Sequence, residues 1–444
     1  MTDVPPPASA DAALPGGTLK RLLRRGLVRA GIVTYVFAGL TLVANLVSGV
    51  ATARALGPDG RGVAFALVTI SQLAGFLFAM GVAQSLSYFI ARQPGDGPRL
   101  LTTWALMLLP FTALAIAISQ LLLPTIFATD GEQAIALGRW FLFTIVLVVG
   151  LELNYGLLLG AQDFFFYNAL RLLQPVLMAV SYVVLWSLDA LTVESALIGS
   201  SACAAFVLVA GTVRAIARIG VGPPAADLGA TSLWYGVRGQ GSTVATHVTA
   251  RLDVAMLPAF VTTASVGLYS VATNVSLIVY QLANTFAGLV LPAAARDPER
   301  GPFKVVGSFW ASLAVAGLLA LGLAIFARPL LGLVYGDAFR DAAEPLLLIL
   351  PGAVLFAGAS ILGAGIYAAG RPFTATLVQL VGMAVTIVGL FIFLRIGGIT
   401  AAALVSSAAY AAVFVASLVA YKLVSRLPWR SFLPLPSRLR ELAR

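Results

Sequence analysis

The segment 234–261 holds the residues best suited to chemistry in this sequence. Arg251 can bind an anion, Asp253 can hold a cation or a proton, and His247, the single histidine of the chain, can exchange protons near neutral pH. On an ideal helix the polar side chains of this segment fall on two adjacent stripes, Ser242, Thr246, Thr249 and Asp253 on one and Thr243, His247 and Arg251 on the other. Their arc of roughly 200° is too wide for one tight helix contact. It therefore predicts one wall of a wet cavity for a substrate or an ion.

Arg251 and Asp253 need separate partners, because residues two apart on a helix point in nearly opposite directions. Glu152, in the apolar segment 134–159, is one candidate partner for Arg251. Two interpretations stay open: the charges contact a substrate or ion, or Arg251 and Glu152 form a structural ion pair. Asp253, Glu152 and His247 are the titratable groups available for proton coupling. The sequence does not choose between protons and sodium.

Four amide side chains lie inside other apolar segments, at Asn45, Gln84, Asn274 and Gln281. Asn274 and Gln281 are seven residues apart and therefore share one helix face. Polar groups in hydrocarbon are costly, so these amides are candidate cavity residues. The alternative is that they only form hydrogen bonds between neighbouring helices.

The composition excludes several classes of protein. Hydrophobic residues make up 60% of the chain and charged residues only 10%, with a mean hydropathy of +0.96, whereas a soluble domain carries roughly 25% charged residues. The net charge of +10 does not indicate nucleic-acid binding, because the basic residues sit at the ends of apolar segments. None of the three lysines follows a glycine, which excludes a P-loop for ATP, and one Cys with one His cannot form a zinc site. We expect no metal, no cofactor and no enzymatic activity.

The elements that position these residues are predicted to be about twelve transmembrane helices with no appreciable soluble domain. Turn and breaker clusters separate the apolar segments, as at Gly57-Pro58-Asp59-Gly60 and Gly222-Pro223-Pro224. Each segment is long enough to span a bilayer. The predicted spans are 30–53, 63–91, 99–123, 134–159, 165–188, 194–219, 234–261, 267–294, 303–326, 342–369, 372–394 and 399–423.

The Lys and Arg residues predict the orientation of these spans. They concentrate in alternate loops and in both termini, so both ends of the chain are expected in the cytoplasm. We predict a disordered basic N-terminus over 1–29, a six-helix lobe over 30–220 and a cytoplasmic linker over 221–233. A second six-helix lobe over 234–424 and a basic tail over 425–444 follow. The tail is expected to rest on anionic membrane lipids, or else to dock a partner protein.

A weak internal repeat supports the division into two lobes. At an offset of about 205 residues, 61–66 (RGVAFA) aligns with 266–271 (VGLYSV). Six helices per half is an even number, so both halves enter the membrane in the same orientation and form a parallel repeat. Such a duplication predicts a central cavity between the lobes. The alternative is chance similarity of two turns.

Four stretches resemble a known family. They are 53–62 (ARALGPDGRG), 159–164 with 168–175 (LGAQDF and NALRLLQP), 251–253 with 266–272 (RLD and VGLYSVA), and 369–372 (AGRP). In their order and placement they are similar to the polysaccharide-biosynthesis flippases, which move O-antigen and exopolysaccharide repeat units. That group belongs to the multidrug/oligosaccharidyl-lipid/polysaccharide exporter superfamily.

The resemblance implies a two-lobed bundle in a bacterial inner membrane that flips an undecaprenyl-pyrophosphate-linked oligosaccharide from the inner to the outer leaflet. A polysaccharide polymerase or glycosyltransferases would be its protein partners. Arg251 fits the pyrophosphate, since arginine binds phosphate oxygens bidentately. Arg54 and Arg61 either receive the headgroup at the outer mouth or meet lipid phosphates. The alternatives are an ion-coupled small-molecule or drug antiporter of the same architecture, and a membrane scaffold that transports nothing.

Overall fold

The computed structural model describes residues 18–128, 131–295 and 301–432, and nearly all of them are helical. No strand occurs within these ranges. Short 3-10 turns connect several of the helices. The helices are α1 (Thr18–Phe78), α2 (Val82–Arg92), α3 (Gly97–Ile126), α4 (Gly131–Phe141), α5 (Ile145–Gly160), α6 (Phe164–Ser187), α7 (Val193–Ile219), α8 (Ala226–Met256), α9 (Thr263–Ala295), α10 (Gly301–Ile325), α11 (Ala327–Tyr335), α12 (Ala343–Ala368) and α13 (Pro372–Ser425).

The twelve predicted spans are present. Among the described residues, nine helical segments are long and apolar enough to cross a membrane. Two of the nine, in α1 and α13, bend sharply at Gly57 and Gly398, so each contains two spans. Both glycines have a positive φ, 64° and 53°, which side chains with a Cβ rarely adopt. The twelfth span is α8, whose polar side chains keep its hydropathy below that of the others.

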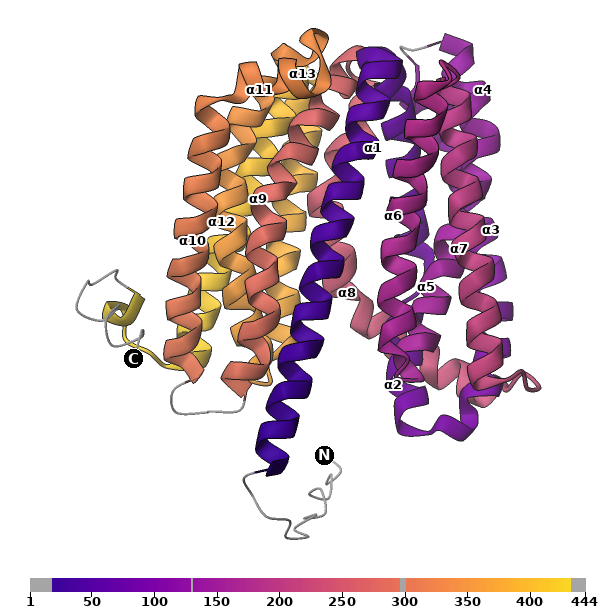
Figure 1. Ribbon diagram of the computed structural model, residues 1–444, viewed down its shortest axis with the longest axis vertical. Helices are drawn as coiled ribbons and strands as arrows, with labels where there is room; N and C mark the ends of the chain where they lie inside the picture. Colours follow the sequence, from indigo (N-terminus) through magenta and orange to yellow (C-terminus); the bar gives the residue numbers. More distant parts are fainter. Residues whose placement is uncertain (1–17, 129–130, 296–300, 433–444) are drawn as a thin grey trace.

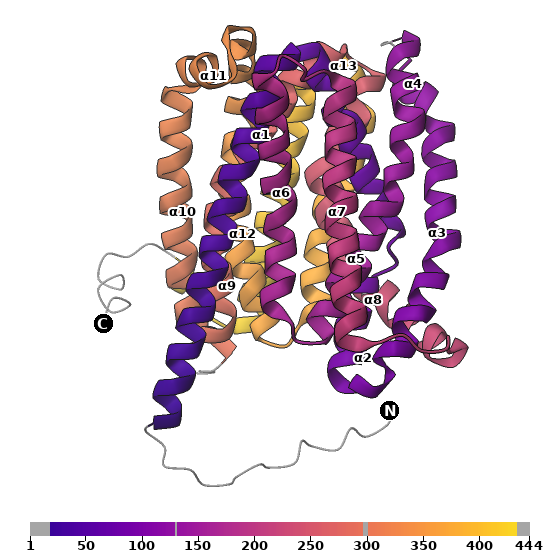
Figure 2. The same cartoon turned by 45° about the vertical axis from the view of Figure 1, so that its right-hand side comes forward.

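The helices form two lobes with α1 between them. Figure 1 shows α2–α7 on one side and α9–α13 on the other, with α1 in front of the gap. α1 packs against α6 of the first lobe and α9 of the second, while α12 packs against α9 and α13 within the second. The bend of α1 lies near the short helix α11, at the opposite end of the bundle from Thr18 (Figure 2). We call these two ends the Gly57 end and the Thr18 end.

Helix α8 joins the two lobes. Its first half packs on α2 and α3, where Trp104 Nε1 donates to Ser232 Oγ at 3.0 Å and Ser85 Oγ donates to the Ser232 carbonyl at 2.7 Å. Its second half packs against α13. Small residues on the first half, such as Gly229 and Gly236, let the helices approach closely. α8 therefore belongs to both lobes.

Two predicted boundaries are wrong in part. α1 begins at Thr18, so the disorder predicted for 1–29 fails for 18–29, while residues 1–17 lie outside the described ranges. α8 begins at Ala226, inside the predicted linker 221–233, because this part of the chain packs on the first lobe. Of the predicted tail, 425–432 is described and ends in a 3-10 turn over Trp429–Phe432, and 433–444 lies outside.

A reciprocal glycine contact closes the lobes at the Gly57 end. A Cβ placed on Gly62 would lie 2.8 Å from the carbonyl carbon of Thr263, and a Cβ on Gly267 would lie 2.8 Å from the carbonyl carbon of Pro58. Real Cβ atoms essentially never come within 3.0 Å. The offset of 205 relates Gly62 to Gly267 and Pro58 to Thr263. The contact of Gly62 with Thr263 is therefore the counterpart of the contact of Gly267 with Pro58. A two-fold duplication predicts such a contact, which supports the internal repeat.

Candidate functional site

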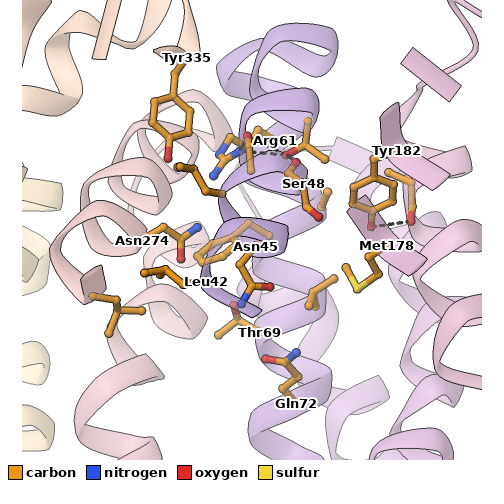
Figure 3. Close-up of a pocket in the computed structure, with 18 of the residues that line it drawn as sticks. Leu42, Asn45, Ser48, Arg61, Thr69, Gln72, Met178, Tyr182, Asn274 and Tyr335 are labelled. Carbon is orange, nitrogen blue, oxygen red and sulfur yellow. Dashed lines mark hydrogen bonds between the residues drawn. The ribbon is translucent and has the colours of Figure 1, made fainter. Parts of the chain in front are cut away.

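A cavity of about 310 Å³ lies between the lobes (Figure 3). It is reached by residues of five helices and of α11: Leu42, Asn45, Leu46, Ser48, Gly49, Thr52, Arg61, Ala64, Phe65, Val68, Thr69 and Gln72 of α1, Met178 and Tyr182 of α6, Ala196 and Leu197 of α7, Arg251 of α8, Asn274, Leu277, Ile278 and Gln281 of α9, and Tyr335 of α11. These described lining residues include two arginines and no Asp or Glu. The cavity therefore carries positive charge with neutral amides and apolar surface around it.

Arg61 forms one end of this cavity and is only 3% exposed. Its Nε donates to Ser270 Oγ of α9 at 2.9 Å, and its Nη1 donates to Thr52 Oγ1 at 2.9 Å and to the Gly49 carbonyl. The guanidinium also lies 5.6 Å from the ring centre of Tyr335. Figure 3 shows Arg61 between Tyr335 and Ser48, above Asn45 and Asn274. Arg61 thus connects the first half of α1 to the second lobe.

Burial raises the pKa of Tyr335 above its ordinary value, and the Arg61 guanidinium opposes this effect. The phenol therefore stays neutral at physiological pH. A neutral ring leaves the charge of Arg61 uncompensated, so the cavity keeps its positive potential.

Arg251 reaches the same cavity from α8. Its guanidinium lies 5.7 Å from the ring centre of Phe65. Among the described residues no carboxylate lies within ion-pair distance of it, and no hydrogen bond to its guanidinium is formed. Asp253 and Tyr410 act on this guanidinium electrostatically, but neither forms an ion pair or a hydrogen bond with it, so its N–H donors are available to an anionic ligand.

Asp253 lies outside this cavity, in the interior of the second lobe. It is 2% exposed. Tyr269 Oη donates to its Oδ2 at 2.5 Å, Ser406 Oγ donates to the same oxygen at 2.8 Å, and the Val254 N–H donates to Oδ1 at 2.7 Å. The carboxyl is therefore held by α8, α9 and α13 together. As the helical spacing predicted, Arg251 and Asp253 point to different places.

His247 and Gln84 lie along the contact between α8 and the first lobe, and neither lines this cavity. The His247 ring stacks on Phe76 of α1 with 4.0 Å between ring centres. Gln84 Nε2 donates to Thr243 Oγ1 at 3.1 Å. The wide polar arc of α8 is thus divided between helix contacts and the cavity, which Arg251 alone reaches from this helix.

Glu152 does not pair with Arg251, and this part of the prediction is wrong. Glu152 also does not line this cavity. It lies on α5, and the basic residue that affects it electrostatically is Arg171 of α6. Arg171 in turn donates to Tyr167 Oη at 3.0 Å. The lobes are therefore not locked together by an Arg251–Glu152 ion pair.

The two arginines predicted at the outer mouth have different places. Arg54 is exposed and donates through Nε to the Val334 carbonyl at 3.0 Å and through Nη2 to the Leu333 carbonyl. These are among the last carbonyls of α11, which a cation stabilises. Arg61 is buried, contrary to the prediction, because the second half of α1 starts directly after Gly57. Residues 58–62, which were predicted to lie between two spans, are helical.

Of the predicted amides, Asn45, Asn274 and Gln281 line the cavity, and Gln281 has further contacts. Gln72 and Tyr335 also line the cavity, although neither was predicted from the sequence. Gln72 could have been predicted by the rule that selected the other amides, since it is a polar residue within an apolar span. Tyr335 could not, because it lies between two predicted spans and only folding brings it to Arg61.

The chain has two lobes, a bent first helix and a cavity between the lobes, and solved structures of membrane transporters have a similar fold. The structure of the lipid II flippase MurJ in its inward closed conformation is similar, with a TM-score of 0.72 and 14% sequence identity over 90% of this chain and 89% of that chain. An inward-facing multidrug resistance MATE family transporter of the MOP superfamily has a TM-score of 0.65 and 13% identity, over 93% of this chain and 100% of that chain. The MATE multidrug transporter DinF-BH has a TM-score of 0.61 and 14% identity, over 92% of this chain and 96% of that chain.

At these identities the likeness establishes the fold alone. No protein-family model matches the sequence, and no curated protein matches it. The predicted all-helical, two-lobed membrane architecture is confirmed.

Proposed function

We propose that this chain flips a lipid-linked anionic saccharide, of the undecaprenyl-pyrophosphate oligosaccharide class, from the inner to the outer leaflet of a bacterial cell membrane. The lobes would alternate between closure at the Gly57 end and closure at the Thr18 end. The observation that carries the proposal is the cavity itself, which holds Arg61 and Arg251 and whose described lining contains no carboxylate.

The two arginines suit a pyrophosphate. Arg251 has its guanidinium free of ion pairs among the described residues, and arginine binds phosphate oxygens bidentately. Arg61 is held by three hydrogen bonds, so its position is fixed in advance of binding. A phosphate placed between them would be recognised from both lobes.

The neutral part of the lining suits sugar hydroxyls. Asn45, Gln72, Asn274 and Gln281 offer amide donors and acceptors from α1 and α9. A volume of about 310 Å³ is at the low end for a ligand site. An oligosaccharide therefore requires the lobes to separate, which alternating access supplies.

The energy source we propose is an ion gradient or the membrane potential, since the sequence has no P-loop. Asp253 is the group best placed for coupling. It lies two residues from Arg251 on the same helix, and the hydroxyl groups that donate hydrogen bonds to it come from α9 and α13. A change of its protonation would alter hydrogen bonds among three helices of the second lobe.

The second candidate is a drug antiporter, which the likeness to MATE transporters favours. A site for a cationic drug would use a carboxylate to pair with the drug's charge. Helix α9 contains no acidic residue, and the single one in α1 is Asp59, which lies near the bend. These two helices therefore supply no carboxylate to such a site. A positively charged cavity disfavours such a cargo.

The test is deletion of the gene in its native host, with mass spectrometry of undecaprenyl-linked oligosaccharides and measurement of surface polysaccharide. Complementation uses wild type, Arg251→Ala and Asp253→Asn, with Arg395→Gln as a control on an exposed arginine outside the cavity. We expect lipid-linked units to accumulate and surface polymer to be lost, with rescue by wild type and the control only.

Unchanged lipid-linked pools together with normal surface polymer, in a host without a second flippase, would remove this proposal and favour the antiporter. A scaffold makes a different prediction. Under that interpretation the Arg251→Ala and Asp253→Asn variants both complement fully, while truncation of the basic tail abolishes function.

A further inference from the structure

Helix α13 brings its two ends together at the Thr18 end of the bundle. The bend at Gly398 reverses the direction of the chain, so the first turn after Pro372 lies beside the last turns before Ser425. A hollow of about 500 Å³ lies between them. Arg371, directly before the helix, and Arg426, directly after it, both face this hollow.

The two arginines have no counter-charge nearby. Both are exposed, and within the described part of the chain neither guanidinium takes part in a hydrogen bond, an ion pair or a ring contact. The hollow is lined without Asp or Glu. The sequence also contains no acidic residue between Glu344 and Glu441. Two cations that share a hollow without a carboxylate repel each other unless an anion binds between them.

The backbone below Arg426 is held in place. Arg426 itself has a φ of 56° and its N–H donates to the Lys422 carbonyl at 3.1 Å. After it the chain turns back onto the second lobe, where Leu427 is 9% and Phe432 is 7% exposed in one cluster with Tyr421. Arg426 is therefore presented toward the hollow by a packed turn.

The remaining walls are apolar. Ala416, Ala420 and Leu423 line the hollow, and Leu423 has 65% of its surface exposed. Thr374 adds one hydroxyl near Arg371. A site with two guanidiniums at the level where helices leave the membrane, above an apolar wall, fits a ligand with an anionic head and an acyl chain.

We propose that this hollow binds the headgroup of an anionic phospholipid from the leaflet at the Thr18 end, with Arg371 and Arg426 on the phosphate and an acyl chain along Leu423. The site is separate from the central cavity and does not depend on the transported substrate. Bound lipid would hold the two ends of α13 together and so stabilise the second lobe. Trp429, next to Lys422, lies at the same level as expected for an interfacial residue.

The experiment uses the purified, delipidated full-length chain in detergent and native mass spectrometry. Phosphatidylglycerol, phosphatidylcholine and inorganic phosphate are added in turn to wild type, to the Arg371→Gln/Arg426→Gln double variant and to Arg430→Gln. Arg430 is an exposed arginine on the same tail outside the hollow, which makes it a matched control. We expect phosphatidylglycerol to bind wild type and the control with equal affinity. It should bind the double variant at least about tenfold more weakly.

Three results would overturn the proposal: equal phosphatidylglycerol affinity in the double variant, equal binding of the zwitterionic lipid to wild type, or complete displacement of the lipid by inorganic phosphate. The last would assign the hollow to a free anion. Each single arginine variant provides a second check in case the double variant unfolds, and the melting temperature without lipid reports its folding.

Discussion

Alanine at Gly62 or Gly267 is expected to push the lobes apart at the Gly57 end. Each added Cβ would come within 3.0 Å of a backbone carbonyl of the other lobe, at Thr263 or Pro58. A carbonyl of the main chain cannot rotate away as a side chain can. The backbones must therefore retreat by about 1 Å to reach the usual separation of carbon atoms.

The free-energy cost of adding either Cβ to the closed state can be estimated. Overpacking of a tight contact costs about 1–3 kcal/mol, and that range shifts a two-state equilibrium about 5- to 150-fold. Because both alanines act on the same contact, the double variant is expected to cost less than the sum of the single variants. At a helical glycine that makes no such contact, alanine is instead expected to stabilise the helix, by up to about 1 kcal/mol.

A disulfide across the contact measures the population of the closed state. Thr263 Oγ1 donates to Asp59 Oδ1 at 3.2 Å, so cysteines at these two positions are close when the lobes are closed. Cys203, the single native cysteine, is first replaced by serine. We expect the initial rate of cross-linking in membranes to fall at least about fivefold when Gly62→Ala or Gly267→Ala is added.

Gly317→Ala is the matched control, because a Cβ there meets nothing within 4 Å. It should leave the cross-linking rate unchanged. If Gly62→Ala also cross-links at the rate of its parent, the glycine contact does not govern closure of the lobes and the reasoning is refuted.

Two further substitutions test the packing of the lobes by thermal unfolding in detergent. Asp253→Asn keeps one side-chain oxygen that can accept from both Tyr269 and Ser406 and should retain most of the stability. Asp253→Ala leaves both buried hydroxyls without their acceptor and should cost about 1–3 kcal/mol; equal melting temperatures for the two variants would contradict this. Trp104→Phe keeps an aromatic ring but removes the bond to Ser232, so we expect a loss of about 1 kcal/mol, and an unchanged melting temperature would show that this bond does not anchor α8.

The sequence was sufficient for the number and approximate bounds of the spans. A helix must satisfy its own backbone hydrogen bonds in hydrocarbon and needs about 20 apolar residues to cross it. This requirement acts on each segment separately, so apolar runs and breaker clusters such as those at Gly57 and Gly222 reveal it. Two spans differ from the prediction. α8 begins earlier, because Ala226 and the residues after it pack against the first lobe. The predicted span 63–91 is interrupted by a turn between α1 and α2, where Met80 and Gly81 have a positive φ.

Local periodicity also determined the relation between neighbours on one helix. Arg251 and Asp253 diverge because two residues on a helix are about 200° apart. Which of them faces the cavity was decided by the packing of α8 between α1 and α13, which no local pattern contains. Glu152 was assigned the wrong partner for the same reason.

Arg61 shows most clearly what could not be predicted from the sequence. Its sequence context, in a Gly- and Pro-rich turn, is that of an exposed loop, and by sequence alone it belongs with Arg54 at the membrane surface. The bend at Gly57 turns the chain back into the bundle within a few residues and places Arg61 against Ser270 and Tyr335, more than 200 residues away along the chain. The cost of crossing the membrane is local and can be summed along the sequence, whereas the composition of a cavity depends on which helices meet, and only the tertiary structure decides that.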